Sequence, residues 1–184
     1  VPMVIEEASV VAAASFMARL AAAGGGFTAS STPPEMIGQM QILDVKDFEE
    51  AIQNLNANKE RLLMTAAVDP MLQQLGGGPR DLEVRLIEES PIGPFLVLHL
   101  IMDVRDAMGA NAVNTALEAL APLVEQISGG RVLLRILSNL ADRRLAKASC
   151  RIPLAELAFK EYRAEQVRDG ILSAWAFAVA DPYR

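Results

Sequence analysis

The sequence is poor in the residues from which proteins build metal sites and disulfides. It contains one cysteine, Cys150, and one histidine, His99, among 184 residues. A single cysteine excludes a disulfide within the chain and a thiolate zinc site, and a single histidine excludes a site of several histidines. We therefore expect no metal centre in this chain, and a reducing, cytoplasmic location.

Positive charge and long apolar runs are also scarce. Lysine and arginine number 17 against 23 acidic residues, which gives a net charge of -6. This balance argues against nucleic-acid binding, which requires basic surface. The most apolar stretches, 9–23 and 95–102, are shorter than the roughly 20 residues that cross a bilayer. Because 52% of the residues are apolar, we expect a packed core and no membrane partner.

The central part of the chain alternates between strand and helix patterns. Apolar residues recur at helical spacing over 47–67 and 113–127, and the strand patterns lie at 36–45, 82–86, 95–104 and 132–137. The resulting order βαββαβ is that of the split-βαβ, or ferredoxin-like, plan, in which an antiparallel sheet carries both helices on one face. Pro122 is awkward within the second helix, where it would cause a kink or a break.

The flanking segments have a different pattern. We expect a short strand at 1–5, a helix that three glycines end at 24–26, a connector at 30–34, a strand at 144–152 and a helix at 164–179. The fold class is therefore α+β, with a small ferredoxin-like domain at 34–138 inserted in a larger mixed α/β domain made of 1–33 and 139–184. Since the chain begins without an initiator methionine, we expect a partial chain.

Two neighbouring acids stand between the first strand pattern and the first helix. If the carboxylate of Glu6 or Glu7 is partly desolvated there, its pKa rises and it can deliver a proton near neutral pH. Alternatively, the two acids are simply favoured at the N-terminus of the helix.

A glycine lies close to a second helix start, in residues 105–111. Gly109 there can expose backbone N–H groups to a phosphate, and the adjacent Asp106 can accept a hydrogen bond from a ribose hydroxyl. The alternative is an ordinary helix start capped by Asp106 or Asn111.

Three further features are interpreted as structural. Residues 76–80 form a glycine-rich turn rather than an anion cradle, because they lack the phosphate-loop pattern. His99 is expected to be a packed histidine on the face of its strand opposite Leu98 and Leu100, and Cys150 to be buried and inert.

Four stretches of the chain resemble segments of the class II (bacterial-type) 3-hydroxy-3-methylglutaryl-coenzyme A reductases. They are PMVIEEASVVAAAS at 2–15, DVRDAMGAN at 103–111, RILSNLA at 135–141 and DPYR at 181–184. Their order and approximate spacing fit as well, and the Asp-Ala-Met-Gly-x-Asn element is specific to these reductases. Ala8 departs from the proline frequent at that position, for which we expect a slightly looser helix start.

The resemblance implies an oxidoreductase that interconverts 3-hydroxy-3-methylglutaryl-coenzyme A and mevalonate plus coenzyme A, through mevaldehyde, with two NAD(H). It also implies a substrate domain interrupted by a small, non-Rossmann cofactor domain. Active sites in the family form at the interface of a homodimer.

Carried over by motif, Glu7 is the catalytic acid, although Glu6 also fits the alignment. Glu7 is preferred because it directly precedes the helix that begins with Ala8. Ser9 and Arg184 are the implied substrate-binding residues, with the arginine pairing the free carboxylate of the substrate.

The cofactor-binding residues follow from the same matches. Asp69 is expected to hold the adenosine ribose, which favours NAD because a carboxylate there repels a 2′-phosphate. The residues expected to border the dinucleotide are Asp106, Met108, Gly109, Asn111 and Asn139.

The family also has a catalytic lysine, aspartate and histidine that find no counterpart in these 184 residues. The chain alone is therefore expected not to turn over. The alternative function is a non-catalytic nucleotide-binding or dimerisation module with a ferredoxin-like fold.

Overall fold

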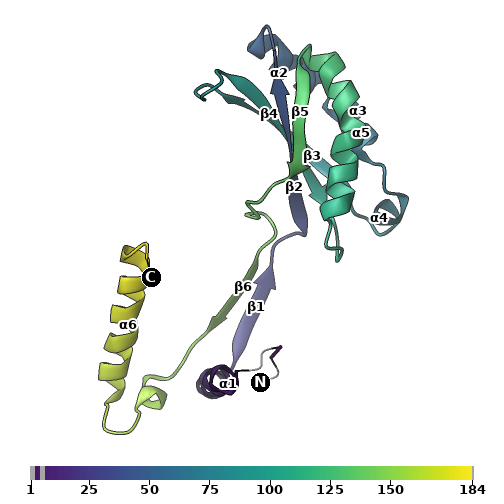
Figure 1. The fold of residues 1–184 in the computed structure, drawn as a ribbon. Coiled ribbons are helices and arrows are strands. Elements are labelled where there is room, and N and C mark those ends of the chain that lie inside the picture. Colours follow the sequence, from purple (N-terminus) through teal and green to yellow (C-terminus); the bar gives the residue numbers. More distant parts are fainter. Residues whose placement is uncertain (1–2, 5–6, 184) are drawn as a thin grey trace. The chain divides into compact units, whose positions relative to one another are not determined.

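A computed structural model of the chain describes residues 3, 4 and 7–183. It divides into two compact units, the first made of residues 1–30 and 147–184 and the second of residues 31–146. Each unit is described by itself (Figure 1). Most of the strand expected at 1–5 falls outside the described residues, and Met3 and Val4 are not in a strand.

The second unit is a four-stranded sheet with helices. Its strands, in the spatial order β3-β4-β2-β5, are Gly78–Ile87, Phe95–Asp103, Glu35–Leu43 and Arg131–Leu137, and every neighbouring pair is antiparallel. The chain runs from β2 through α2 (Phe48–Ala57), α3 (Lys59–Ala66) and α4 (Pro70–Gln74) into β3 and β4, then through α5 (Ala110–Ser128) into β5.

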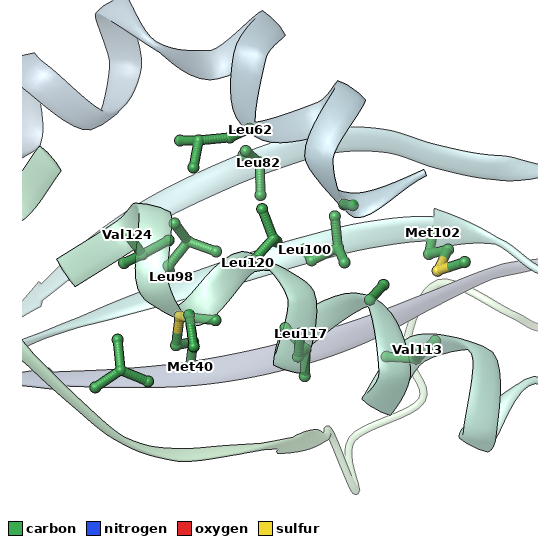
Figure 2. Close-up of a cluster of buried hydrophobic side chains, with 14 of the residues drawn as sticks. Met40, Leu62, Leu82, Leu98, Leu100, Met102, Val113, Leu117, Leu120 and Val124 are labelled. Carbon is green, nitrogen blue, oxygen red and sulfur yellow. The ribbon is translucent and has the colours of Figure 1, made fainter. Parts of the chain in front are cut away.

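The core lies between the sheet and its helices (Figure 2). Alternation along β4 directs Leu96, Leu98 and Leu100 to one face, and all three are fully buried. They pack with apolar residues of α5 that recur every three or four positions: Val113, Leu117, Leu120 and Val124. Burying a leucine side chain contributes about 1.5–3 kcal/mol, so this layer stabilises the unit.

Two helix expectations need correction. The helix expected over 47–67 is broken at Asn58, which ends α2 and begins α3. The Asn58 side chain donates to the carbonyl oxygen of Asn54 at 2.9 Å, the oxygen to which its own backbone N also donates. Pro122 does not break α5, because it lies on the exposed side, where solvent can satisfy the carbonyl group that loses its donor.

The first unit contains α1 (Ala8–Ala23), η1 (Leu154–Leu157) and α6 (Ala164–Ala180). The strands β1 (Phe27–Ser31) and β6 (Ala146–Cys150) form a two-stranded sheet in which the chain crosses from one unit to the other. β1 was not expected from the sequence, whereas β6 and α6 lie where a strand and a helix were predicted. The domain boundaries drawn from the sequence stay a prediction.

Few side chains of the first unit are covered. Leu20 and Ala21 are its buried residues among those described, and α6 has none, although it carries apolar side chains such as Ile171, Trp175 and Phe177. No helix in residues 3–4 and 7–183 combines the length and apolarity needed to cross a membrane. The location expected from the sequence stays a prediction.

Candidate functional site

The strand register brings three connections of the chain to one end of the sheet. Asp103, the last residue of β4, pairs with Glu35 at the start of β2 and with Gly78 at the start of β3. The turn at 76–78 and residues 104–109, called here the β4–α5 loop, therefore lie at the same end. In β5, Leu137 pairs with Gly38 of β2, so the segment after β5 begins there too.

A buried carboxylate organises this end. Asp103 is 6% exposed and forms ion pairs with Arg80 at 3.0 Å and Arg105 at 3.4 Å. Both arginines also donate to the carbonyl oxygen of Gly76. Burial alone would raise the pKa of Asp103, but the hydrogen bonds from the Arg105 backbone and the Arg80 side chain, with the two positive charges, lower it.

The start of α5 leaves its first-turn N–H groups without a side-chain cap. Gly109 precedes the helix with a φ of 88°, a left-handed conformation that glycine adopts freely. A Cβ there would lie 2.6 Å from Sδ of Met36. Neither Asp106 nor Asn111 caps the helix, so the alternative interpretation of this start as side-chain-capped is wrong.

Arg144 ties the β4–α5 loop to the segment that follows β5. Its Nη1 donates to the carbonyl oxygen of Ala107 at 3.0 Å, and its Nη2 to that of Arg105 at 3.2 Å. Arg105 itself has a φ of 51°, which is uncommon for a residue with a side chain. The half-buried Arg144 guanidinium thus fixes two carbonyl groups of an unusually shaped loop.

The predicted cofactor residues lie at or near this end. Asp106 and Asn111 are exposed on the β4–α5 loop and at the start of α5, Met108 is 73% exposed, and Asn139 is exposed just after β5. Asp69 is the N-cap of α4, where Oδ1 accepts a hydrogen bond from the backbone N of Leu72 at 2.9 Å.

The predicted acid lies in the other unit. Oε1 of Glu7 accepts hydrogen bonds from Oγ of Ser9 at 2.8 Å and from its backbone N at 3.2 Å. These bonds lower the pKa of the exposed Glu7 carboxylate and outweigh the small rise that desolvation causes, so the raised pKa of a desolvated acid is not found within this chain. Within this chain Glu7 is the N-cap of α1, which agrees with the alternative that the acids are favoured at the start of the helix. Glu6 and Arg184 lie outside the described residues.

His99 packs on the sheet as expected, on the face opposite Leu98 and Leu100. Its Nε2 lies 3.4 Å from Nε2 of Gln39. Burial and the positive charges of Arg85 and Arg143 lower the pKa of His99, against the smaller opposing effect of Glu83 and Asp142. Cys150, expected to be buried, is free and half-buried.

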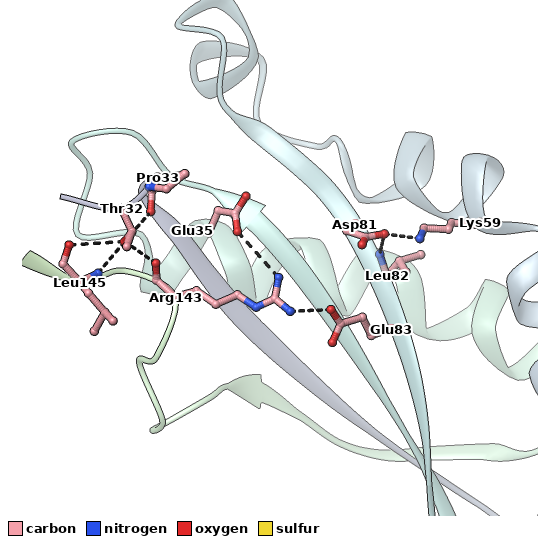
Figure 3. A network of polar contacts seen from close by, with 9 residues as sticks. All are labelled: Thr32, Pro33, Glu35, Lys59, Asp81, Leu82, Glu83, Arg143 and Leu145. Atoms are coloured by element: carbon pink, nitrogen blue, oxygen red, sulfur yellow. Dashed lines mark hydrogen bonds and ion pairs between the residues drawn. The ribbon is translucent and has the colours of Figure 1, made fainter.

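A polar network holds the returning segment after β5 to the sheet (Figure 3). Arg143 forms ion pairs with Glu83 of β3 at 2.5 Å and with Glu35 of β2 at 3.8 Å. Oγ1 of Thr32 donates to the carbonyl oxygen of Arg143 at 2.5 Å and accepts from the backbone N of Leu145 at 2.8 Å. Arg144 therefore extends from a fixed backbone.

Sequence reasoning missed the residues that shape the site. Arg80, Asp103 and Arg144 carry no spacing signal, because their partners are far away in the sequence; Asp103 and Arg105 appeared only within the stretch that resembles the reductases. Among the residues that the structure describes, no group of three or more His, Cys, Asp or Glu is placed to hold a metal ion.

Comparisons with known proteins agree with one another. Residues 1–184 match the family profile described as hydroxymethylglutaryl-coenzyme A reductase. The chain is 48% identical over 185 residues to 3-hydroxy-3-methylglutaryl-coenzyme A reductase of Archaeoglobus fulgidus, a match covering 100% of this chain and 41% of the relative. It is 32% identical over 152 residues to the probable reductase of Borreliella burgdorferi, covering 80% of this chain and 33% of the relative.

Solved structures give the same result. The 3-hydroxy-3-methylglutaryl-coenzyme A reductase of Streptococcus pneumoniae matches with a TM-score of 0.91 and 41% identity, over 100% of this chain and 49% of that one. A structure of the class II enzyme from the same organism, bound to NADPH in open conformations, matches with a TM-score of 0.92 and 42% identity over the same shares. The chain thus spans less than half the length of these relatives.

Proposed function

The chain belongs to the hydroxymethylglutaryl-coenzyme A reductase family, class II, and from this premise we propose that it takes part in interconverting 3-hydroxy-3-methylglutaryl-coenzyme A and mevalonate plus coenzyme A. Two dinucleotides, bound in turn, would each supply one hydride, the first to the thioester carbon and the second to the mevaldehyde carbon. The carbon–sulfur bond breaks between these steps, and the coenzyme A sulfur and the product alkoxide each take a proton.

One observation carries the proposal that the second unit binds the dinucleotide. The first turn of α5 follows Gly109 and has no side-chain cap, at the end of the sheet where Arg80, Arg105 and Arg144 gather. Backbone N–H groups at a helix N-terminus attract phosphate, and the absence of a Cβ at Gly109 lets the start of α5 pack closely on Met36 and Val104. In this proposal Asp106, Met108, Asn111 and Asn139 border the cofactor, as the resemblance implies.

The domain roles belong to the same proposal. The strand order β3-β4-β2-β5 and the placement of the helices support a ferredoxin-like small domain at 34–138. Residues 1–33 and 139–184 are then two parts of the larger substrate domain.

We keep NAD as the proposed cofactor because of Asp69. Its Oδ1 is occupied as the N-cap of α4, which fixes the carboxylate, and its Oδ2 can accept from a ribose hydroxyl. The same negative charge disfavours a 2′-phosphate. The pneumococcal relative is described as bound to NADPH, so titration of the full-length protein with NADH and NADPH is the direct test. Tighter binding of NADPH would overturn the choice of NAD.

For the first unit we propose that Glu7 protonates the reacting carbonyl oxygen and that Ser9 contacts the substrate. The Ser9 hydroxyl now donates to Glu7, and it can turn to a substrate oxygen when Glu7 is protonated. An exposed acid with a lowered pKa is a poor proton donor near neutral pH. We therefore propose that a second copy in a homodimer covers Glu7 and raises its pKa, and that Arg184 pairs with the substrate carboxylate.

The 184 residues alone are proposed not to turn over. The lysine that the resemblance implies for stabilising the oxyanion has no motif-matched counterpart here, and neither have the aspartate and the histidine. His99, the one histidine, is packed on the sheet of the second unit.

The test is mevalonate- and coenzyme A-dependent reduction of NAD by the full-length protein and by the 184-residue chain. We expect steady reduction by the full-length protein and none by the chain. Dinucleotide binding without turnover by the full-length protein would instead support the alternative, a non-catalytic nucleotide-binding module. Steady turnover by the chain alone would refute the need for further residues.

A further inference from the structure

We infer that Arg80 and Arg105 together form the anion site that takes the phosphate groups of the dinucleotide. This inference rests on the proposed function and deepens it by assigning the phosphate contacts to two side chains. Neither arginine was a candidate from its spacing, and residues 76–80 were interpreted as a simple turn. The structure shows instead that this turn and the β4–α5 loop share one polar centre.

Asp103 and the carbonyl oxygen of Gly76 hold the guanidinium groups of Arg80 and Arg105 in place. Nη2 of Arg80 lies 3.0 Å from Oδ2 of Asp103, and Nη2 of Arg105 lies 3.4 Å from the same oxygen. Each Nη2 also donates to the carbonyl oxygen of Gly76. Asp103 is buried and is the last residue of β4. Its ion pairs therefore anchor both guanidinium groups to the sheet. Such anchoring lowers the entropy cost of binding an anion.

The outer edges of the two groups remain available. Their side chains are 41% and 40% exposed, and within residues 3–4 and 7–183 no hydrogen bond is made by Nη1 of either arginine. Nε of Arg105 is buried and has no partner among those residues. A ligand oxygen does not reach this buried Nε, so the Nη1 groups of the two half-exposed side chains are the donors offered to an anion.

The charge of the cluster also suits a phosphate. Two arginines face one carboxylate, so a net positive charge is left over. Arg105 directly precedes Asp106 in the β4–α5 loop, and this loop leads into the uncapped first turn of α5, which adds a partial positive charge. Guanidinium groups bind phosphate oxygens through paired, charge-assisted hydrogen bonds.

The experiment measures the dissociation constants of NADH and NADPH for the full-length protein at several salt concentrations. The variants are Arg80→Gln and Arg105→Gln, with Arg80→Lys and Arg105→Lys in case loss of charge beside Asp103 prevents folding. The matched control is Arg61→Gln, because Arg61 is exposed on α3 and forms no ion pair with any described residue. Thermal melting confirms that each variant is folded.

We expect each glutamine substitution to raise the dissociation constant of the dinucleotide by at least about tenfold. Each lysine substitution should raise it less, and Arg61→Gln should leave it at the wild-type value. The dependence of affinity on salt should also become shallower in the glutamine variants, because a direct charge contact is lost. Equal losses for NADH and NADPH identify the diphosphate as the bound group, and a loss for NADPH alone identifies the 2′-phosphate.

Two results overturn the inference alone. In the first, the wild type binds a dinucleotide and every folded variant binds it equally well. In the second, affinity falls but its salt dependence is unchanged, which means that the arginines act only by shaping the loop. Failure of the wild type to bind either dinucleotide would overturn the proposed function itself, and this inference with it.

Discussion

Nη1 of Arg144 donates a hydrogen bond to the carbonyl oxygen of Ala107, 3.0 Å away and 37 residues earlier in the chain. The bond joins the segment after β5, which leads back to the first unit, to the loop that precedes α5. Nη2 of the same guanidinium holds the carbonyl of Arg105. One side chain therefore fixes the backbone on both sides of Asp106.

Replacing Arg144 by glutamine should weaken dinucleotide binding. The two carbonyl groups lose a charged donor, so we expect a loss of about 1–3 kcal/mol in the free energy of unfolding and a dissociation constant for the dinucleotide raised about tenfold. Titration of the full-length protein, with chemical denaturation in parallel, measures both.

Arg143→Gln is the matched control for that variant. Arg143 is the neighbouring arginine, but its side chain pairs with Glu35 and Glu83 and does not contact the β4–α5 loop. It should lose stability without a comparable loss of dinucleotide affinity. If the two variants bind the dinucleotide equally well, Arg144 does not position the loop.

Gly109→Ala should distort the β4–α5 loop, because the added Cβ would clash with neighbouring side chains. At a φ of 88° a side chain is strained, and a Cβ would lie 2.6 Å from Sδ of Met36 and 2.9 Å from Cβ of Val104. We expect about 1–3 kcal/mol of destabilisation and weaker dinucleotide binding, measured by urea unfolding and titration.

Gly170→Ala tests whether this loss is specific to the position. Gly170 lies within α6, and a Cβ there meets nothing within 4 Å. Alanine should leave stability unchanged or raise it by about 0.5–1 kcal/mol. An equal loss in both variants would show that glycine is not specially required at position 109.

Local patterns predicted much of this fold. Alternation in 95–104 placed Leu96, Leu98 and Leu100 on one face, and the mixed α+β class is confirmed. The break at Asn58 was missed because the apolar periodicity continues across it from α2 into α3.

The candidate site was only partly predictable. The role of Gly109 could be predicted because residues 106–111 form the Asp-Ala-Met-Gly-x-Asn stretch that resembles the reductases. The pairing of Asp103 with Arg80 could not be predicted, since it depends on the register of β3 against β4. The lowered pKa of Glu7 agrees with the alternative drawn from the sequence, an acid favoured at the helix start, and not with a desolvated acid. It follows from the bonds to Ser9 and from exposure, which residue types do not reveal.

His99 should make stability depend on pH. Its pKa is lowered in the folded chain, chiefly by burial, so the unfolded chain binds the proton more readily. The stabilising effect is complete above the unfolded pKa of about 6.5 and is lost as the pH falls from there through the folded value. The slope is limited to about 1.4 kcal/mol per pH unit for one proton.

Urea unfolding of the wild type and of His99→Gln between pH 7.5 and 5.5 measures this effect. The wild type should lose more stability than the variant over that range, because glutamine does not titrate. Parallel losses in the two proteins would show that other groups cause the pH dependence.

Glu7→Gln should remove the proposed proton donor while keeping an acceptor for the Ser9 backbone N. We expect activity of the full-length protein to fall about 10²–10⁴-fold with little change in its melting temperature. Glu165→Gln, an exposed acid in the first turn of α6, is the control and should stay active. Full activity of Glu7→Gln would exclude Glu7 as the acid.

The ratio of dinucleotide oxidised to coenzyme A released, measured with the full-length protein and 3-hydroxy-3-methylglutaryl-coenzyme A, tests the reductase assignment most directly. Reduction of a thioester to an alcohol requires two hydrides, so the account predicts two dinucleotides oxidised for each free thiol formed. Release of coenzyme A without dinucleotide oxidation, or no reaction with this thioester at all, would contradict it.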